Sequence, residues 1–208
     1  MENKINLNSS NEWEKIYLGD SDSEIKAINP EDISNFVNDQ FENTFKSSLK
    51  DFIRIPNLSP AYDPTYKTNG NLERAAEHLK EFADNCGLIG INSTIYNNGN
   101  TPLLWITINS TEKTETKSVL MYGHFDKQPP FTGWDKNKSP TNPVEENGRL
   151  YGRGVCDDGY AFYTCLLSIR TLQHLNIPHP KIKIIIEGDE ESGSTDLVEY
   201  LEIIKVIL

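Results

Sequence analysis

Ser-Val-Leu-Met-Tyr-Gly-His-Phe-Asp, residues 118–126, joins a short apolar run to two polar side chains at its carboxyl end. A continuous apolar run of this length is typical of a central strand that is buried on both faces. His124 and Asp126 follow the run, one residue apart. Because sites in open α/β sheets form outside the carboxyl ends of the strands, we expect these two side chains to face a functional crevice.

Two later segments also end in acidic side chains. Gly152-Arg153-Gly154 leads into Asp157 and Asp158, where an apolar helical pattern begins. The apolar run 182–186 predicts another strand, and Glu190 and Glu191 follow it. The side chains that we expect to converge on one crevice are His124, Asp126, Asp157, Glu190 and Glu191.

These residue types suit a two-metal hydrolytic site. Zinc prefers imidazole and carboxylate ligands, about four in number, and two metals about 3.5 to 4 Å apart can share a bridging carboxylate. Carboxylates that are not ligands would then act as a general base or orient the ligands. The sequence has no Walker-type phosphate loop and no nucleophile elbow.

Each segment taken alone also has a structural interpretation. Asp157 and Asp158 are preferred at a helix N-terminus, where they cap the helix and complement its dipole. Glu190 and Glu191 suit a solvated acidic turn, and an isolated His-x-Asp pair is usually an ordinary loop pair. The functional interpretation is favoured because three such signals occur in order, each at the end of a predicted element.

The rest of the chain predicts an α/β domain, a sheet with helices on both faces. The first half predicts a helix that Asp32 caps and Pro56 ends, a helix from Asn71 to a Gly87 C-cap, and a hairpin of strands 89–96 and 102–108. The second half predicts an ordered loop over 127–147, a helix from Asp157 or Asp158, and a last helix from Ser194 or Thr195. His78 falls on a polar helix face, where we expect a solvated side chain.

Composition narrows the classes of partner and compartment. The 208 residues carry a net charge of −11, which argues against nucleic acid and anionic membrane as partners. No window is apolar enough for a membrane span or a signal-peptide core, so we predict a cytoplasmic protein. Cys86, Cys156 and Cys165 form no CxxC pair and are expected to be buried thiols, although Cys156 sits beside the acidic residues and could be an exception. Residues 1–30 predict a polar, loosely ordered arm.

At the acidic segments the chain resembles a known family. The motifs are Gly123-His124-Phe125-Asp126, Tyr151-Gly152-Arg153-Gly154 with Asp157-Asp158-Gly159, and Glu-Gly-Asp-Glu-Glu-Ser-Gly-Ser over 187–194. Together they resemble the zinc exopeptidases that include carnosinases, dipeptidase V, carboxypeptidase G and aminoacylases. The resemblance covers roughly residues 32–208 and implies that 31–208 form the amino-terminal part of a metallopeptidase catalytic domain.

The resemblance also implies a role for each residue. His124 would bind one metal, Asp157 would bridge two, and Glu191 would bind the second. Glu190 would be the general base, and Asp126 would orient His124. The metals would be zinc, with manganese or cobalt also suited to these ligands. The family usually has lysine after the paired aspartates, where Gly159-Tyr160 stands here; lysine is not a ligand, so the implied metal set is unaffected.

The family takes a further acidic ligand and a histidine from downstream, together with a smaller dimerisation domain. The present sequence ends in the apolar run 203–208, as a domain truncated at its C-terminus would. Two functions therefore stay open. One is a metal-dependent hydrolase of dipeptides or acyl amino acids, with a homodimer or a complementing chain as partner. The other is a catalytically silent fragment or interaction module of the same family.

Overall fold

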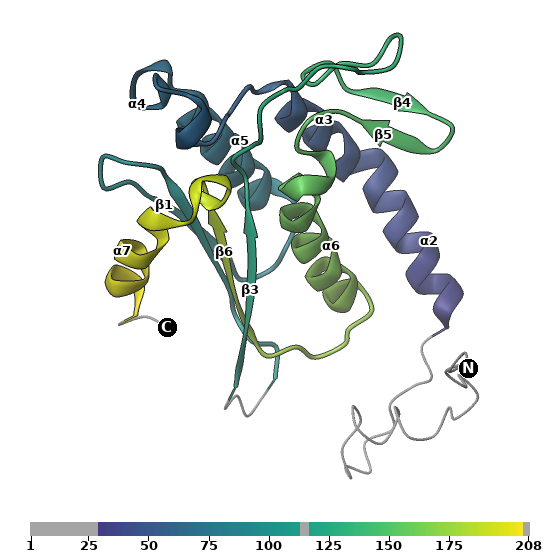
Figure 1. The fold of residues 1–208 in the computed structure, drawn as a ribbon. Helices are drawn as coiled ribbons and strands as arrows, with labels where there is room; N and C mark the ends of the chain where they lie inside the picture. The colour runs from purple at the N-terminus through teal and green to yellow at the C-terminus, as the bar shows by residue number, and fades with distance from the viewer. Residues whose placement is uncertain (1–28, 113–116, 206–208) are drawn as a thin grey trace, which may run out of the picture.

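The computed structural model describes residues 29–112 and 117–205, and a sheet of four strands lies at its centre (Figure 1). The strands lie in the order β1-β2-β6-β3. Their bounds are Ile91–Tyr96 for β1, Leu103–Ile108 for β2, Ser118–His124 for β3 and Lys181–Glu187 for β6. The predicted hairpin is therefore confirmed as the antiparallel pair of β1 and β2.

The parallel pairing of β3 with β6 positions the site. His124 lies opposite Glu187 in this register, so both strands end at the same edge of the sheet. The connection between the two strands includes helix α6 (Tyr160–His174), as parallel strands require a crossover. The loops that follow β3 and β6 therefore start side by side, as the sequence predicted.

Strand β3 lies at the edge of the sheet, so the prediction of a central strand buried on both faces is wrong. Leu120 and Tyr122 are 54% and 49% exposed, and Val119 is also exposed. Within the described residues, β3 pairs only with β6. An apolar run indicates burial in general, but it does not say how many strands flank it.

Helices cover both faces of the sheet, as predicted. Side chains alternate along β2, so Leu104 and Ile106 join the larger core beneath α5 (Asn71–Asn85) and α6. Leu103 and Trp105 point to the other face and pack against α7 (Thr195–Ile204). The fold is therefore the predicted α/β sheet with helices on both faces.

The N-terminal helical segment consists of α2 (Pro30–Gln40), a π-helical turn over Phe41–Phe45 and α3 (Lys46–Arg54). Asn29, not Asp32, caps its start, because the Asn29 side chain accepts the N–H of Glu31 at 3.0 Å. The next residue, Pro30, suits the first helical position, which places the start ahead of the predicted one. The segment ends just before Pro56, as predicted.

Shorter elements complete the described part. They are the 3-10 turn Pro60–Tyr62, α4 (Tyr66–Asn69), the hairpin of β4 (Val144–Glu146) and β5 (Arg149–Tyr151), the π-helical turn Val155–Gly159 and the 3-10 turn Glu190–Ser192. The β4–β5 hairpin lies in and just after the segment that we predicted to be a loop. Residues 1–28, which include most of the predicted arm, lie outside the described residues. None of the described helices is both long and apolar enough to cross a membrane.

Two side-chain predictions are corrected. His78 is half-buried rather than solvated, because its Nε2 lies 3.0 Å from the Ser48 hydroxyl on α3. Of the cysteines, Cys86 is buried and Cys165 is half-buried, but Cys156 is exposed. The helical pattern of the sequence shows only that His78 does not face the main core. It does not reveal that α3 lies beside His78 and partly buries it.

Candidate metal centre

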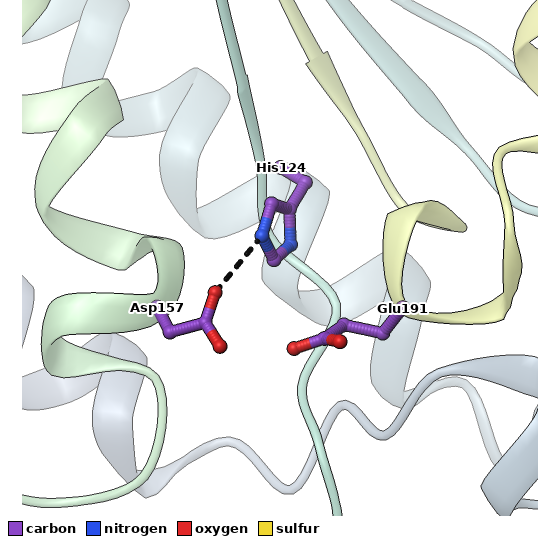
Figure 2. Close-up of side chains that lie close together, drawn as sticks. All are labelled: His124, Asp157 and Glu191. Carbon is purple, nitrogen blue, oxygen red and sulfur yellow. Dashed lines mark ion pairs between the residues drawn. The ribbon is translucent and has the colours of Figure 1, made fainter.

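Three side chains from separate segments bring potential metal ligands together. His124 ends β3, Asp157 lies in the π-helical turn before α6, and Glu191 lies in the 3-10 turn after β6. One ligand atom from each lies within 4.8 Å of the others (Figure 2). His124 Nε2 is 3.3 Å from Asp157 Oδ1. This imidazole and two carboxylates form a donor set of the kind that zinc binds.

The crowding of these segments depends on Gly123. A Cβ added at Gly123 would meet the Cβ of Ala161 on α6 and Oδ2 of Asp158, both at 3.0 Å. Glycine therefore lets α6 approach the end of β3 closely. Asp158 uses this approach, since its Oδ2 accepts the backbone N–H of His124 at 3.3 Å. The sequence had left open whether Asp158 only begins the helix; the structure places it directly behind the histidine.

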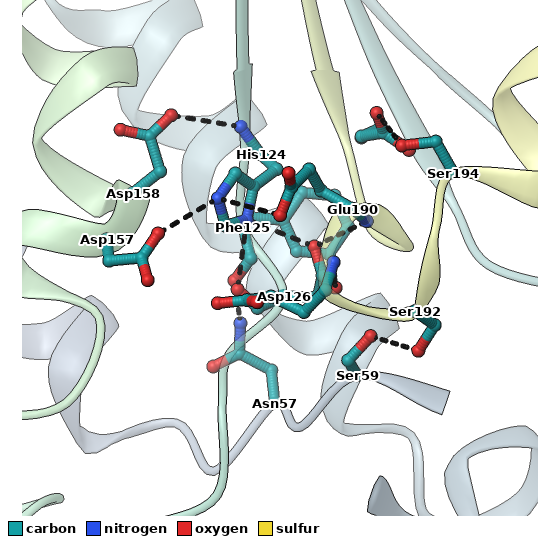
Figure 3. A network of polar contacts seen from close by, with 12 residues as sticks. Asn57, Ser59, His124, Phe125, Asp126, Asp157, Asp158, Glu190, Ser192 and Ser194 are labelled. Atoms are coloured by element: carbon teal, nitrogen blue, oxygen red, sulfur yellow. Dashed lines mark hydrogen bonds and ion pairs between the residues drawn. The ribbon is translucent and has the colours of Figure 1, made fainter. Parts of the chain in front are cut away.

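Asp126 connects the two loops beneath the ligands (Figure 3). Its fully buried carboxylate lies 3.2 Å from His124 Nδ1 and accepts the backbone N–H of Glu190 at 3.2 Å and of Glu191 at 3.0 Å. Because Nδ1 of His124 is held by Asp126, Nε2 faces Asp157 and Glu190, where a metal ligand is needed.

Electrostatics at the centre favour a cation. Burial lowers the pKa of His124, but the hydrogen bond and the charge of Asp126, with Glu190 and Asp158 nearby, outweigh burial and raise that pKa to about 9. Burial and the charge of Asp157 raise the pKa of Glu191. Glu191 Oε1 is also buried without a hydrogen-bond partner among the described residues. Crowded carboxylates with an unpaired oxygen fit a divalent metal.

A loop near the N-terminus holds both site loops in place, which the sequence did not predict. Asn57 Nδ2 donates to the carbonyl of Phe125 at 2.5 Å, and the N–H of Lys127 donates to the carbonyl of Asn57 at 3.1 Å. Ser59 contacts the hydroxyl of Ser192, which also accepts the N–H of Ala61 at 2.8 Å. The segment 57–61 therefore braces the turns that carry Asp126 and Glu191.

Lys127 is another residue whose role the sequence did not predict. Its side chain is 2% exposed, and its ammonium donates to the carbonyls of Phe52 at 2.9 Å and Ile55 at 2.8 Å. The ammonium also lies 4.2 Å from the centroid of the Phe52 ring. These carbonyls lie at the C-terminus of α3, where a cation is favourable. With no carboxylate partner in the described structure, burial lowers the pKa of Lys127 to about 7.

The structure brings together all the side chains that the sequence singled out. His124, Asp157 and Glu191 supply the clustered ligand atoms. Glu190 Oε2 lies 3.6 Å from His124 Nε2, and Asp126 lies behind the histidine. Gln128 was not predicted, although its amide donates to Glu191 Oε2. No sequence signal marks Gln128, because its role depends on the turn after β6 lying beside it.

Comparison with known proteins gives the family context. Residues 120–206 match the profile of Peptidase family M20/M25/M40. The chain is 27% identical over 175 residues to a rat Beta-Ala-His dipeptidase, a match that covers 79% of this chain and 34% of that protein. It is 35% identical over 88 residues to a Cys-Gly metallodipeptidase of Schizosaccharomyces pombe, covering 41% of this chain and 18% of the relative.

Two solved structures resemble the fold. Human carnosine dipeptidase 1 matches with a TM-score of 0.66 at 25% identity, over 84% of this chain and 38% of that one. The M20 metallo-carboxypeptidase Sso-CP2 of Sulfolobus solfataricus matches with a TM-score of 0.67 at 26% identity, over 80% and 35%. The chain spans about a third of the length of these proteins. Residues 120–206, which contain every side chain of the candidate centre, are similar to the Peptidase family M20/M25/M40.

Proposed function

We propose that this chain supplies the metal-binding part of a peptidase that hydrolyses dipeptide-like substrates or acyl amino acids. The cluster of His124, Asp157 and Glu191 ligand atoms within 4.8 Å carries this proposal. Residues 31–208 then form the amino-terminal part of the catalytic domain. The dipeptidases among the relatives support the substrate class.

The metal ligands follow from the donor atoms. His124 Nε2 would hold one metal, Glu191 would hold a second, and Asp157 would be shared between them. Zinc fits this set, and manganese and cobalt also suit it. When bound, such ions polarise a carbonyl and make a water more acidic. Asp126 would orient the imidazole, because its carboxylate lies against Nδ1 and leaves Nε2 directed at the metal.

Glu190 is the general base in this proposal. Its carboxylate is partly exposed and lies 3.6 Å from His124 Nε2, so both water and substrate reach it. A Glu190 oxygen takes a proton from the attacking water and later gives it to the leaving amine. The hydrogen bond from its backbone N–H to Asp126 holds the turn that carries it.

The alternative is a catalytically silent interaction module of the same family. The exposed apolar side chains Leu120 and Tyr122 on edge strand β3 favour it, because such surface usually contacts another segment or chain. This reading predicts zinc binding without turnover. A homodimer or a complementing chain remains part of the hydrolase proposal.

The test separates metal binding from chemistry. Zinc affinity and hydrolysis of a dipeptide panel are measured for the chain and for Asp157→Asn and Glu190→Gln, with a chelator control. Asp157→Asn is expected to weaken zinc binding, whereas Glu190→Gln is expected to keep zinc and lose turnover. Glu77→Gln, which neutralises an exposed carboxylate on α5, should change neither. Turnover that survives both site substitutions would refute the hydrolase proposal, and zinc binding without any turnover would support the silent module.

A further inference from the structure

A hollow lined by the loop after β3 contains an arginine that forms no ion pair within the described residues. The hollow has a volume of about 300 Å³ and lies between the loop after β3 and strand β5. Arg153 lines it, and within the described residues its guanidinium forms no ion pair. Its Nε is buried and has no hydrogen-bond acceptor there.

The neighbouring cation is already neutralised. Lys138 lines the same hollow, but its ammonium pairs with Glu146 at 2.9 Å and lies 3.6 Å from Asp135. It also lies 4.0 Å from the centroid of the Tyr151 ring. The cation in this hollow that forms no ion pair within the described residues is therefore Arg153.

The Phe131 ring lies over the Arg153 guanidinium, and the backbone of Phe131 is strained. Its ring centroid lies 5.1 Å from the guanidinium carbon of Arg153. The side chain is 61% exposed, yet its backbone has a φ of 51°, in the left-handed region that is costly for a bulky residue. The burial of this side chain is too small to compensate for the backbone cost. Strained residues of this kind are typical of binding sites.

The loop that lines the hollow is connected to the metal centre through Gln128. Gln128 donates to Glu191, and Phe131 follows Gln128 by three residues. Three residues span at most about 11 Å, so the backbone of Phe131 lies within about that distance of the backbone of Gln128. Trp134 lines it as well, with its ring fixed by donation from Nε1 to the Pro130 carbonyl at 2.8 Å.

We infer that this hollow binds a carboxylate carried by a peptide-like ligand with an apolar side chain. The Arg153 guanidinium pairs with the carboxylate, because its planar fork matches two carboxylate oxygens. Phe131 and Trp134 contact the apolar part. The carboxylate belongs to the C-terminus of a peptide or to an acidic side chain. The binding inference stands on the hollow itself; its use in placing a substrate rests on the proposed function.

The test follows the Nε–H resonance of Arg153 in nitrogen-15 spectra of the whole chain. Three probes are titrated: N-acetylphenylalanine, its neutral amide, and an N-acetylated, C-amidated glutamate. A saturable shift with the first and none with the amide is expected. A shift with the glutamate probe assigns the site to side-chain carboxylates also, and its absence restricts it to the C-terminus. Equal binding of the neutral amide would overturn the inference.

Matched variants test the assigned residue. Arg153→Met should weaken N-acetylphenylalanine binding at least about tenfold, as loss of a charge-assisted pair predicts. Lys136→Met removes the same charge from an exposed position in the same loop and should change binding less than about twofold. Phe131→Gly should weaken binding without lowering the midpoint of thermal unfolding. Equal losses in Arg153→Met and Lys136→Met would show general charge attraction and refute the site. If Arg153→Met does not fold, the resonance shift in the unmodified chain decides.

Zinc separates this inference from the proposed function. The probe shift at Arg153 should be the same with added zinc and with a chelator. A shift that the chelator abolishes would place the carboxylate at the metal centre and overturn the inference. A shift that persists in a chain without peptidase activity would leave the hollow established and the proposed function refuted.

Discussion

The carboxylate of Asp126 accepts the backbone N–H of Glu191 at 3.0 Å, which ties the loop after β3 to the turn after β6. The same carboxylate holds His124 at 3.2 Å. Two of the proposed ligands therefore depend on one buried group for their relative position, although Asp126 itself binds no metal in our proposal.

Asp126→Asn is expected to weaken zinc binding by about 10- to 100-fold, the usual effect of losing a group that orients a ligand. The amide keeps the shape of the side chain but supplies a single acceptor oxygen for the three donors around it. Competition with a chromophoric chelator measures the change. Asp51→Asn, at an exposed position on α3, is the control and should bind zinc like the parent chain. Unchanged affinity in Asp126→Asn would show that the ligands are held without it.

Gly154→Ala is expected to lower the free energy of unfolding by about 2–4 kcal/mol, through backbone strain and overpacking together. Gly154 has a φ of 82°, and an added Cβ would meet Cε of the buried Lys127 at 2.5 Å. Gly148→Ala is the matched control, because Gly148 has a φ of 72° with nothing within 4 Å. It should show only the backbone part, about 1 kcal/mol. Urea unfolding of both variants gives the difference, and equal losses would mean that Lys127 moves aside freely.

Lys127 should make stability rise with pH. Its pKa is lowered from its ordinary value of 10.5 to about 7 by burial. Between these values the unfolded chain binds more protons than the folded chain, so the free energy of unfolding increases by up to about 1.4 kcal/mol per pH unit. This stability is complete above pH 10.5 and is lost as the pH falls to about 7.

Lys127→Met removes this titration while keeping a similar volume. The difference in unfolding free energy between the parent chain and Lys127→Met should therefore grow in favour of the parent from pH 7 to pH 9. Urea unfolding at several pH values measures it. Parallel pH profiles for the two proteins would show that the ammonium is stabilised by its carbonyl acceptors and keeps its proton throughout.

Ser59 and Ser192 should be energetically coupled. Their hydroxyls contact each other, and the Ser192 hydroxyl also accepts the N–H of Ala61. A double-mutant cycle of Ser59→Ala and Ser192→Ala is expected to give a coupling free energy of about 0.5–1.5 kcal/mol in urea unfolding. Ser59→Ala combined with Ser110→Ala, whose hydroxyl donates to the His179 carbonyl, should be additive. Additivity in both cycles would contradict a brace between segment 57–61 and the turn after β6.

The parts of the fold that the sequence predicted are those with local signals. The apolar runs gave β3 and β6, and the placement of acids after them predicted where the site lies. The position of β3 at the edge of the sheet was missed, because Leu120 and Tyr122 look the same in sequence whether or not a further strand covers them. The first helix starts earlier than predicted, because Asn29 caps it and Pro30 occupies its first position, whereas the prediction placed the cap at Asp32.

The parts of the site that the sequence missed depend on distant contacts. Lysine is almost never buried without a carboxylate, so Lys127 carried no signal of its position beneath α3. Asn57 and Ser59 lie in a segment without periodicity, and polar loop residues are usually solvated. Only the fold reveals that they touch the turns after β3 and β6. Side chains with a recognisable chemical role were therefore predictable, and those that hold them in place were not.

The bond between Ser59 and Ser192 joins residues 133 positions apart, and the one between Asp126 and Glu191 joins residues 65 apart. Contacts of such sequence separation form late in folding, since the closure of long loops must precede them. A ribosome-bound chain has no assembled ligand cluster until Ser192 has emerged. Under the proposed function, a metal would bind only chains that have already closed these loops, and it would stabilise only those chains.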